Sequence, residues 1–177
     1  MTALLIALLV YVPMLVEARR AAMHERTQRA RGGIEPSGDV YRVMRVAYPG
    51  AFLVMLGEGV WRGAVPAPVV AAGLAIFAAA KALKWWAILS LGPFWTFRIL
   101  VIPGAALVAA GPYRFMKHPN YLAVAGELVG AALMTGATVA GPAATVLFCA
   151  LMARRVQVEN RALQLAKNPA ETGSHKG

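Results

Sequence analysis

The sequence contains very little cysteine and little charge. Cys149 is its only cysteine, so no disulfide can form within the chain, and a disulfide-stapled secreted module is excluded. Charged types make up 15% of the residues against 59% for hydrophobic types, a balance that also excludes a disordered protein. The abundant material is apolar, with 17 glycines and 11 prolines that closely packed membrane helices tolerate. The composition therefore predicts an integral membrane protein.

Five apolar stretches divide the chain. They cover residues 2–16, 46–61, 65–89, 121–136 and 140–153. A spanning helix needs about 20 apolar residues, so the third stretch suffices and the others must borrow flanking residues or thin the bilayer. Only Ala137-Thr138-Val139 separates the last two, which predicts a tight helical hairpin. We therefore expect an all-α protein of about five transmembrane helices.

The basic residues fall on one side of these predicted spans. With the amino terminus outside, that side carries seventeen of the eighteen lysines and arginines, and only Arg62 lies on the other. The positive-inside rule makes the basic side cytoplasmic. The first stretch is interpreted as a retained span because its charges follow the apolar run, whereas a signal peptide has them before it. The net charge of +10 then reflects membrane orientation, so we expect membrane lipids and not nucleic acid as partners.

The segment between the third and fourth spans, residues 94–117, is irregular but apolar. Its prolines and glycines exclude a continuous helix, and such backbone must lie against protein or line a cavity. Next, Pro119 disfavours helical backbone at His118 and suits the first helical position itself. The fourth helix should therefore begin at Pro119, with Arg114 and Lys117 beside its amino end. This arrangement suits a bound carboxylate or phosphate, and snorkelling cations at a membrane surface explain it equally well.

Two glutamates lie inside apolar spans, where acids are costly and either paired or functional. They are Glu58 in the second stretch and Glu127 in the fourth, and both explanations stay open. Glu127 lies within a GxxxG pattern, Gly126 to Gly130, which lets a neighbouring helix approach closely; we expect the fifth. Farther on, Arg155 and Glu159 are four residues apart and share one helix face, as a surface ion pair or as part of a site.

One long motif carries a family resemblance. The string Gly111-Pro112-Tyr113-Arg114-x-x-Lys117-His118-Pro119-Asn120-Tyr121, followed by the hairpin and Arg155-x-x-x-Glu159, resembles the isoprenylcysteine carboxyl methyltransferase family. The specific part covers residues 98–163. The resemblance implies an integral membrane enzyme that uses S-adenosylmethionine, in a single domain over residues 1–163. Its cofactor-binding core would be residues 94–163, with the C-terminal hairpin forming the pocket, and residues 164–177 would be a polar, disordered tail.

The resemblance also implies roles for individual residues. Arg155 would be catalytic and would face the reacting group of the substrate. The residues expected to contact the cofactor are Arg98, Leu107, Val108, Tyr113, His118, Pro119, Asn120, Tyr121 and Glu159, and no metal site is expected. The chain departs from the family where Ala105 replaces a histidine, where Asn160 replaces the second glutamate of a Glu-Glu pair, and in lacking an aromatic tail.

Two classes of lipophilic acceptor stay open. The carboxylate of a prenylated cysteine is already ionised and needs only orientation by a cation such as Arg155. The sequence is also similar to a bacterial branch of the family that methylates long-chain alkylresorcinols and alkylpyrones, which implies a location in the bacterial inner membrane. A phenol, with a pKa near 10, needs a base, and no His-Asp pair is evident because Asp39 is the only aspartate.

Two further alternatives come from other classes of protein. One is a non-enzymatic membrane transporter or scaffold, whose polar residues are only structural. The other is a reductase, which would bind a nicotinamide cofactor, although no phosphate-binding Gly-x-Gly-x-x-Gly follows a predicted strand. The sequence leaves the oligomeric state open.

Overall fold

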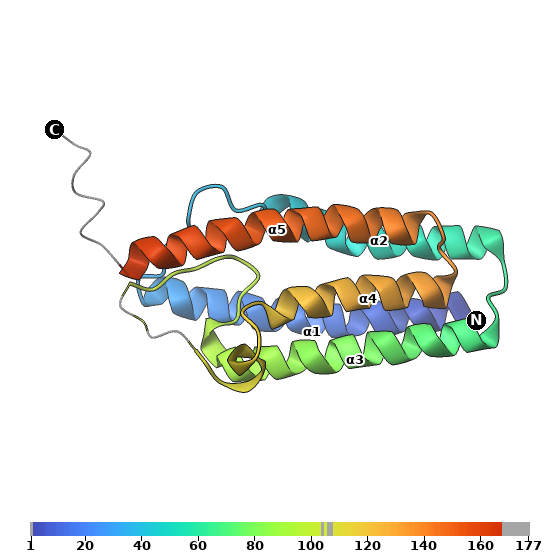
Figure 1. Cartoon of the computed structure of the whole chain (residues 1–177), viewed down its shortest axis with the longest axis horizontal. Helices are drawn as coiled ribbons and strands as arrows, with labels where there is room; N and C mark the ends of the chain where they lie inside the picture. The colour runs from blue at the N-terminus through green and yellow to red at the C-terminus, as the bar shows by residue number, and fades with distance from the viewer. Residues whose placement is uncertain (1, 104, 106–107, 168–177) are drawn as a thin grey trace.

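The computed structural model describes residues 2–103, 105 and 108–167, which form five α-helices in an elongated bundle (Figure 1). These helices are α1 (Thr2–Ala30), α2 (Tyr41–Arg62), α3 (Ala67–Leu91), α4 (Pro119–Thr135) and α5 (Ala140–Lys167). Two short 3-10 helices, η1 (Gly92–Phe94) and η2 (Gly111–Arg114), lie in the connector between α3 and α4. The all-helical prediction is therefore confirmed for the described part of the chain.

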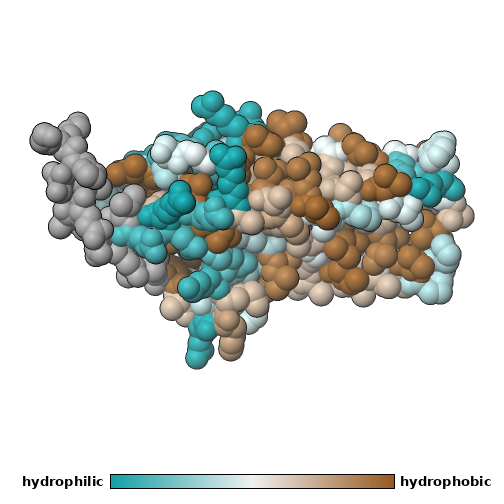
Figure 2. All heavy atoms as spheres, turned by 45° about the horizontal axis from the view of Figure 1, so that its top comes forward, coloured by the Kyte–Doolittle hydropathy of each residue, from teal (hydrophilic) through white to brown (hydrophobic). Residues whose placement is uncertain are grey.

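Two segments are long and apolar enough to cross a membrane by length and composition. Among the described residues these are Tyr41–Arg62 and Ala67–Phe94, fewer than the five spans predicted. Figure 2 shows apolar side chains covering much of one half of the visible face, with hydrophilic ones gathered toward the other end. Large apolar side chains such as Leu5, Leu53 and Leu147 are exposed. An extensive apolar surface of this kind suits contact with lipid.

The helix boundaries follow local backbone rules. His118 is the N-cap of α4 and Pro119 its first residue, as predicted. Gly136 ends α4 with a left-handed backbone (φ 68°), and α5 begins at Ala140, so the tight hairpin is confirmed. The helix α5 continues to Lys167, through a run of good helix formers. Residues 164–167 of the predicted tail are therefore helical, and residues 168–177 lie outside the described chain.

The close approach predicted by the GxxxG pattern occurs, but its partner is α3. A Cβ atom added to Gly130 would lie 2.8 Å from the carbonyl oxygen of Gly73, and one added to Gly73 would lie 2.7 Å from that of Gly130. One added to Gly126 would lie 2.9 Å from the Cβ of Ala80. The expectation that α5 packs on this motif is therefore wrong, because α3 carries the complementary small residues.

Four charged side chains meet inside the bundle and form a buried ion quartet of Glu17, Lys81, Lys84 and Glu127. The Lys84 Nζ atom lies 2.7 Å from Glu17 and 3.3 Å from Glu127, and the Lys81 Nζ atom lies 2.8 Å and 3.1 Å from the same two residues. The hydroxyl of Tyr48 on α2 donates to Glu127. Glu127 is therefore structurally paired, and the two lysines lie well inside α3, where their charges are balanced.

Glu58 is paired at the end of the bundle that lies opposite the connector between α3 and α4. Its carboxylate lies 2.6 Å from the Nε atom of Arg62 and accepts backbone N–H groups from Val139 (3.0 Å) and Ala140 (2.6 Å). A helix start leaves several N–H groups without partners inside the helix. Glu58 on α2 therefore caps α5 from a neighbouring helix and holds the hairpin in place.

Candidate functional site

Three predicted site residues on α4 and α5 contact one another at the end of the bundle where the connector lies. The hydroxyl of Tyr121 donates to Glu159 Oε2 at 2.9 Å, and His118 Nδ1 lies 3.8 Å from the same oxygen. The rings of His118 and Tyr121 are stacked, with centroids 5.3 Å apart. Because the hairpin makes α5 run back along α4, Glu159 near the end of one helix reaches the start of the other.

Three more predicted residues lie beside this group. Tyr113 is half-buried in η2, and burial, followed by the nearby charge of Glu159, raises the pKa of its phenol well above the usual value. Tyr113 therefore stays neutral and can donate a hydrogen bond. Pro119 is buried at the first position of α4. Asn120 has a buried side-chain oxygen with no hydrogen-bond partner in the described structure, which leaves an acceptor available for a donor group.

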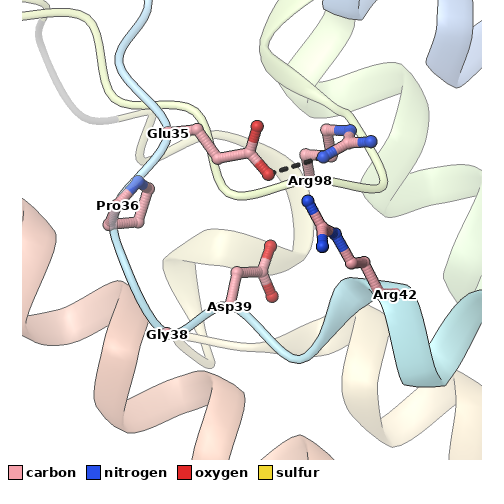
Figure 3. Close-up of a pocket in the computed structure, with 6 residues that line it drawn as sticks. All are labelled: Glu35, Pro36, Gly38, Asp39, Arg42 and Arg98. Carbon is pink, nitrogen blue, oxygen red and sulfur yellow. Dashed lines mark hydrogen bonds and ion pairs between the residues drawn. The ribbon is translucent and has the colours of Figure 1, made fainter.

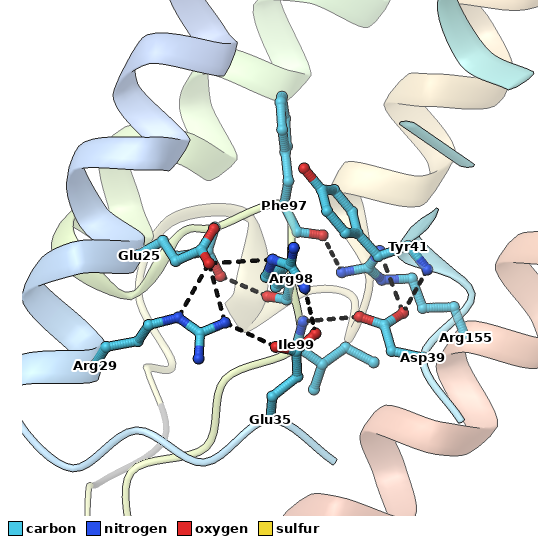
Figure 4. Close-up of polar contacts among 10 residues, drawn as sticks. Glu25, Arg29, Glu35, Asp39, Tyr41, Phe97, Arg98, Ile99 and Arg155 are labelled. Atoms are coloured by element: carbon cyan, nitrogen blue, oxygen red, sulfur yellow. Dashed lines mark hydrogen bonds and ion pairs between the residues drawn. The ribbon is translucent and has the colours of Figure 1, made fainter. Parts of the chain in front are cut away.

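Arg155 lies one helical turn before Glu159 and is buried, with 6% of its surface exposed. One of its terminal nitrogens donates to the carbonyl oxygen of Phe97, and the other lies 3.6 Å from Asp39 (Figure 4). This second nitrogen also lies 3.8 Å from the sulfur of Met44. Arg155 and Glu159 are four residues apart on α5, so their side chains lie on the same face of that helix. The site therefore holds a buried cation next to the group formed by His118, Tyr121 and Glu159.

Arg98 lies in the connector between α3 and α4, at the end of the bundle where hydrophilic side chains gather, which we call the polar end. Its guanidinium lies 2.6 Å from Glu35 and 3.1 Å from Glu25, and it covers the ring of Tyr41 at 4.6 Å. Within the described residues, no hydrogen bond or ion pair joins Arg98 to Tyr121 or Glu159. Of the remaining predicted cofactor contacts, Val108 is half-buried and Leu107 lies outside the described residues.

A polar cavity of about 420 Å³ lies beside Arg98 (Figure 3). It is lined by Glu35, Pro36, Gly38, Asp39, Arg42 and Arg98. Most of the lining comes from the loop between α1 and α2, residues 31–40. The loop is therefore part of the polar end and not a free connection.

The sequence did not identify the residues that contact Arg155. Asp39, Met44 and the carbonyl of Phe97 belong to segments far from α5 in the chain. A backbone carbonyl leaves no trace in a motif. The available signal was that Asp39 is the one aspartate of the chain, within a loop of glycine and proline.

The chain matches the sequence profile of the isoprenylcysteine carboxyl methyltransferase family over residues 72–165. That range contains α4, all but the last two residues of α5, and each predicted site residue. Two curated relatives carry no assigned function. The uncharacterized protein YpbQ of Bacillus subtilis is 32% identical over 161 residues, 91% of this chain and 95% of the relative. An uncharacterized protein of Haemophilus influenzae is 23% identical over 141 residues, 79% of this chain and 82% of the relative.

No solved structure matches the chain. The family match covers more than half of the chain, and within the matched range His118, Tyr121 and Glu159 lie in contact. The chain therefore belongs to the isoprenylcysteine carboxyl methyltransferase family, a family of membrane methyltransferases.

Proposed function

We propose that the protein transfers a methyl group from S-adenosylmethionine to an oxygen atom of a lipophilic acceptor at the polar end of the bundle. The observation that carries the proposal is the contact of Tyr121 with Glu159 and His118, with Arg155 buried one helical turn away. Aromatic rings, a carboxylate and a buried cation within one group suit the binding of a charged methyl donor beside an anionic acceptor.

The residues present fit the cofactor. The unpartnered oxygen of Asn120 can accept a hydrogen bond from an amino or hydroxyl group of the ligand. Glu159 can accept further hydrogen bonds from ribose hydroxyls or an ammonium group. The stacked rings of His118 and Tyr121 and the neutral phenol of Tyr113 suit a planar base. The start of α4, with Lys117 and Arg114 beside it, suits a carboxylate.

The residues of the chain would act by binding and orientation. Bound S-adenosylmethionine supplies an electrophilic methyl group on a sulfonium. Arg155, held next to the donor pocket, would align the acceptor oxygen for in-line attack, and positioning of this kind can contribute several kcal/mol. Burial of the guanidinium strengthens its attraction to an anion because little water surrounds it.

An acceptor that is already ionised fits this site best. Asp39 is the carboxylate next to Arg155, and both of its oxygens are already engaged by backbone N–H groups, whereas an acceptor that is already ionised needs only a cation. We therefore favour an acidic acceptor, such as the carboxylate of a prenylated cysteine, with the hydroxyl of a long-chain alkylresorcinol or alkylpyrone as the alternative. In this proposal the acceptor comes from the bilayer and the polar end faces the cytoplasm of a bacterium.

Binding of S-adenosylhomocysteine to the purified protein tests the donor pocket. Calorimetry should detect binding to wild type, and Glu159→Ala should weaken it about tenfold or more, because a charged hydrogen-bond acceptor is lost. Arg161→Ala, an exposed position on the same helix, serves as the control. Absence of binding to wild type would favour a transporter or scaffold.

Methylation of N-acetyl-farnesylcysteine and of an alkylresorcinol, assayed side by side, tests the reaction. Arg155→Ala should lower turnover about 100-fold while S-adenosylhomocysteine still binds. The neighbouring exposed Arg154→Ala is the matched control and should stay close to wild type. Full activity of Arg155→Ala would remove that residue from the mechanism.

A further inference from the structure

We propose that Asp39 is a positioning residue for Arg155, so that the loop of residues 31–40 completes the acceptor side of the site. This inference rests on the proposed function, because it concerns how the cation assigned to the acceptor is held. It arises from a contact between two segments that neither the family motif nor the cofactor pocket includes.

Asp39 is itself rigidly held. One carboxylate oxygen accepts the backbone N–H of Tyr41 at 3.0 Å, at the start of α2, and the other accepts the backbone N–H of Ile99 at 3.2 Å. Its side chain is 4% exposed. Three segments far apart in the sequence therefore meet at Asp39, namely the loop, the connector and α5 (Figure 4).

Asp39 reaches Arg155 in two ways. Its Oδ1 atom lies 3.6 Å from one terminal nitrogen of the guanidinium. Its bond to Ile99 also anchors the connector two residues after Phe97, whose carbonyl accepts from the other terminal nitrogen. The Nε atom of Arg155 is buried and has no partner in the described structure. The direction of the guanidinium is therefore set by Asp39 and the connector that Asp39 holds.

The loop has further anchors that would keep Asp39 in place. Ile34 and Val101 form an antiparallel bridge, with N···O distances of 2.9 Å and 3.0 Å. Glu35 is paired with Arg98 at 2.6 Å. None of these contacts involves Tyr121 or Glu159, so a change at Asp39 should affect the alignment of the acceptor and leave the donor pocket intact.

Turnover and donor affinity, measured separately, test the inference. Asp39→Asn keeps the shape of the side chain and removes its charge, and we expect kcat to fall about tenfold on whichever acceptor probe is methylated, N-acetyl-farnesylcysteine or the alkylresorcinol. Affinity for S-adenosylhomocysteine should stay within about twofold. Asp39→Glu, which restores the charge, should recover part of the turnover. Arg31→Gln, an exposed position in the same loop, should remain near wild type.

Chemical modification of arginine gives a second measurement that needs no acceptor. Phenylglyoxal labelling followed by mass spectrometry should modify Arg155 several-fold faster in Asp39→Asn than in wild type, because the buried guanidinium is released. The rate at exposed Arg154 should not change. If Asp39→Asn is not recovered from membranes, Asp39→Glu decides by the same measurements, because the displaced carboxylate should lower kcat and expose Arg155 without weakening donor binding.

Unchanged kcat or unchanged Arg155 labelling in the Asp39 variant would overturn the inference. A parallel loss of donor affinity would also overturn it, since Asp39 would then support the fold or the cofactor pocket. A wild-type protein that fails to bind S-adenosylhomocysteine, or full turnover by Arg155→Ala, would instead contradict the proposed function.

Discussion

At the scale of single residues, the buried ion quartet is the strongest constraint on the bundle. Two lysines from α3 lie between Glu17 of α1 and Glu127 of α4, and Glu17, Lys84 and Glu127 are almost fully buried. The charges balance in number. Removing one partner from such a cluster leaves a buried charge without compensation, which typically costs about 3–5 kcal/mol.

Lys84→Met should therefore destabilise the protein by about 3–5 kcal/mol, measured by thermal or denaturant unfolding in detergent. The double variant Lys84→Met with Glu17→Gln restores the balance of charge and should be less destabilised than Lys84→Met alone. The exposed Lys117→Met is the control. Additive losses in the double variant would show that the quartet does not act as a unit.

The sequence allowed us to predict backbone conformation that depends on immediate neighbours. It did not allow us to predict ion pairs between side chains that meet only when the helices pack. His118 and Pro119 begin α4 as expected because proline restricts both itself and the residue before it. Lys81 and Lys84 were counted with the cytoplasmic cations because position along a helix does not reveal its partners. In the structure both lysines are paired with carboxylates on two other helices, Glu17 of α1 and Glu127 of α4.

At the scale of elements, the contact between α3 and α4 depends on the absence of side chains. Gly73 and Gly130 lie backbone to backbone, and Phe77 also borders Gly130. A GxxxG pattern indicates that another helix approaches closely, but which helix does so depends on which one carries a complementary surface. This is why the close approach could be predicted and its partner could not.

Gly130→Ala should destabilise the bundle by about 1–3 kcal/mol through overpacking, because its new Cβ atom would lie 2.8 Å from backbone atoms of α3. Gly57→Ala on α2 is the matched control, because a Cβ atom there meets nothing within 4 Å. That control should be neutral or gain up to about 1 kcal/mol in helix propensity. Equal unfolding temperatures for the two variants would contradict the close contact.

At the scale of the whole molecule, the polar end is assembled from segments that the chain order keeps apart. In α1, Gln28 donates to the carbonyl of Pro93 at 3.1 Å, and His24 Nδ1 lies 2.9 Å from the carbonyl of Trp95. The loop then joins the connector through Glu35 and Arg98. Such long-range contacts have no local signature, so the motif could assign His118, Tyr121 and Glu159 to one predicted cofactor pocket but could not indicate how the loop closes over Arg155.

Closure of this loop should weaken in acid. Partial burial disfavours the charged form of Glu35, but hydrogen bonds from Arg29 and Arg98 outweigh it and hold the pKa of the carboxyl below its ordinary value of 4.5. Its stabilising contribution is therefore fully present above pH 4.5 and is lost as the pH falls through the lowered pKa.

Hydrogen exchange over residues 31–40, corrected for the intrinsic pH dependence of exchange, should show reduced protection once the pH falls below the lowered pKa of Glu35. Glu35→Gln should show a weaker dependence on pH over the same range, with residues of the hairpin as the internal reference. Loop protection that stays constant into strong acid in wild type would argue against the pairing of Glu35 with the two arginines.

The capping of α5 by Glu58 has a consequence for the route by which a lipophilic acceptor could reach the site. Glu58 fastens α2 to the start of α5 at the end of the bundle opposite the connector (Figure 1). These two helices are therefore held together at that end. At the other end Arg155 of α5 contacts Met44 of α2 and Asp39 just before that helix. A long hydrocarbon tail that slides sideways between α2 and α5 would therefore arrive with its head beside the guanidinium.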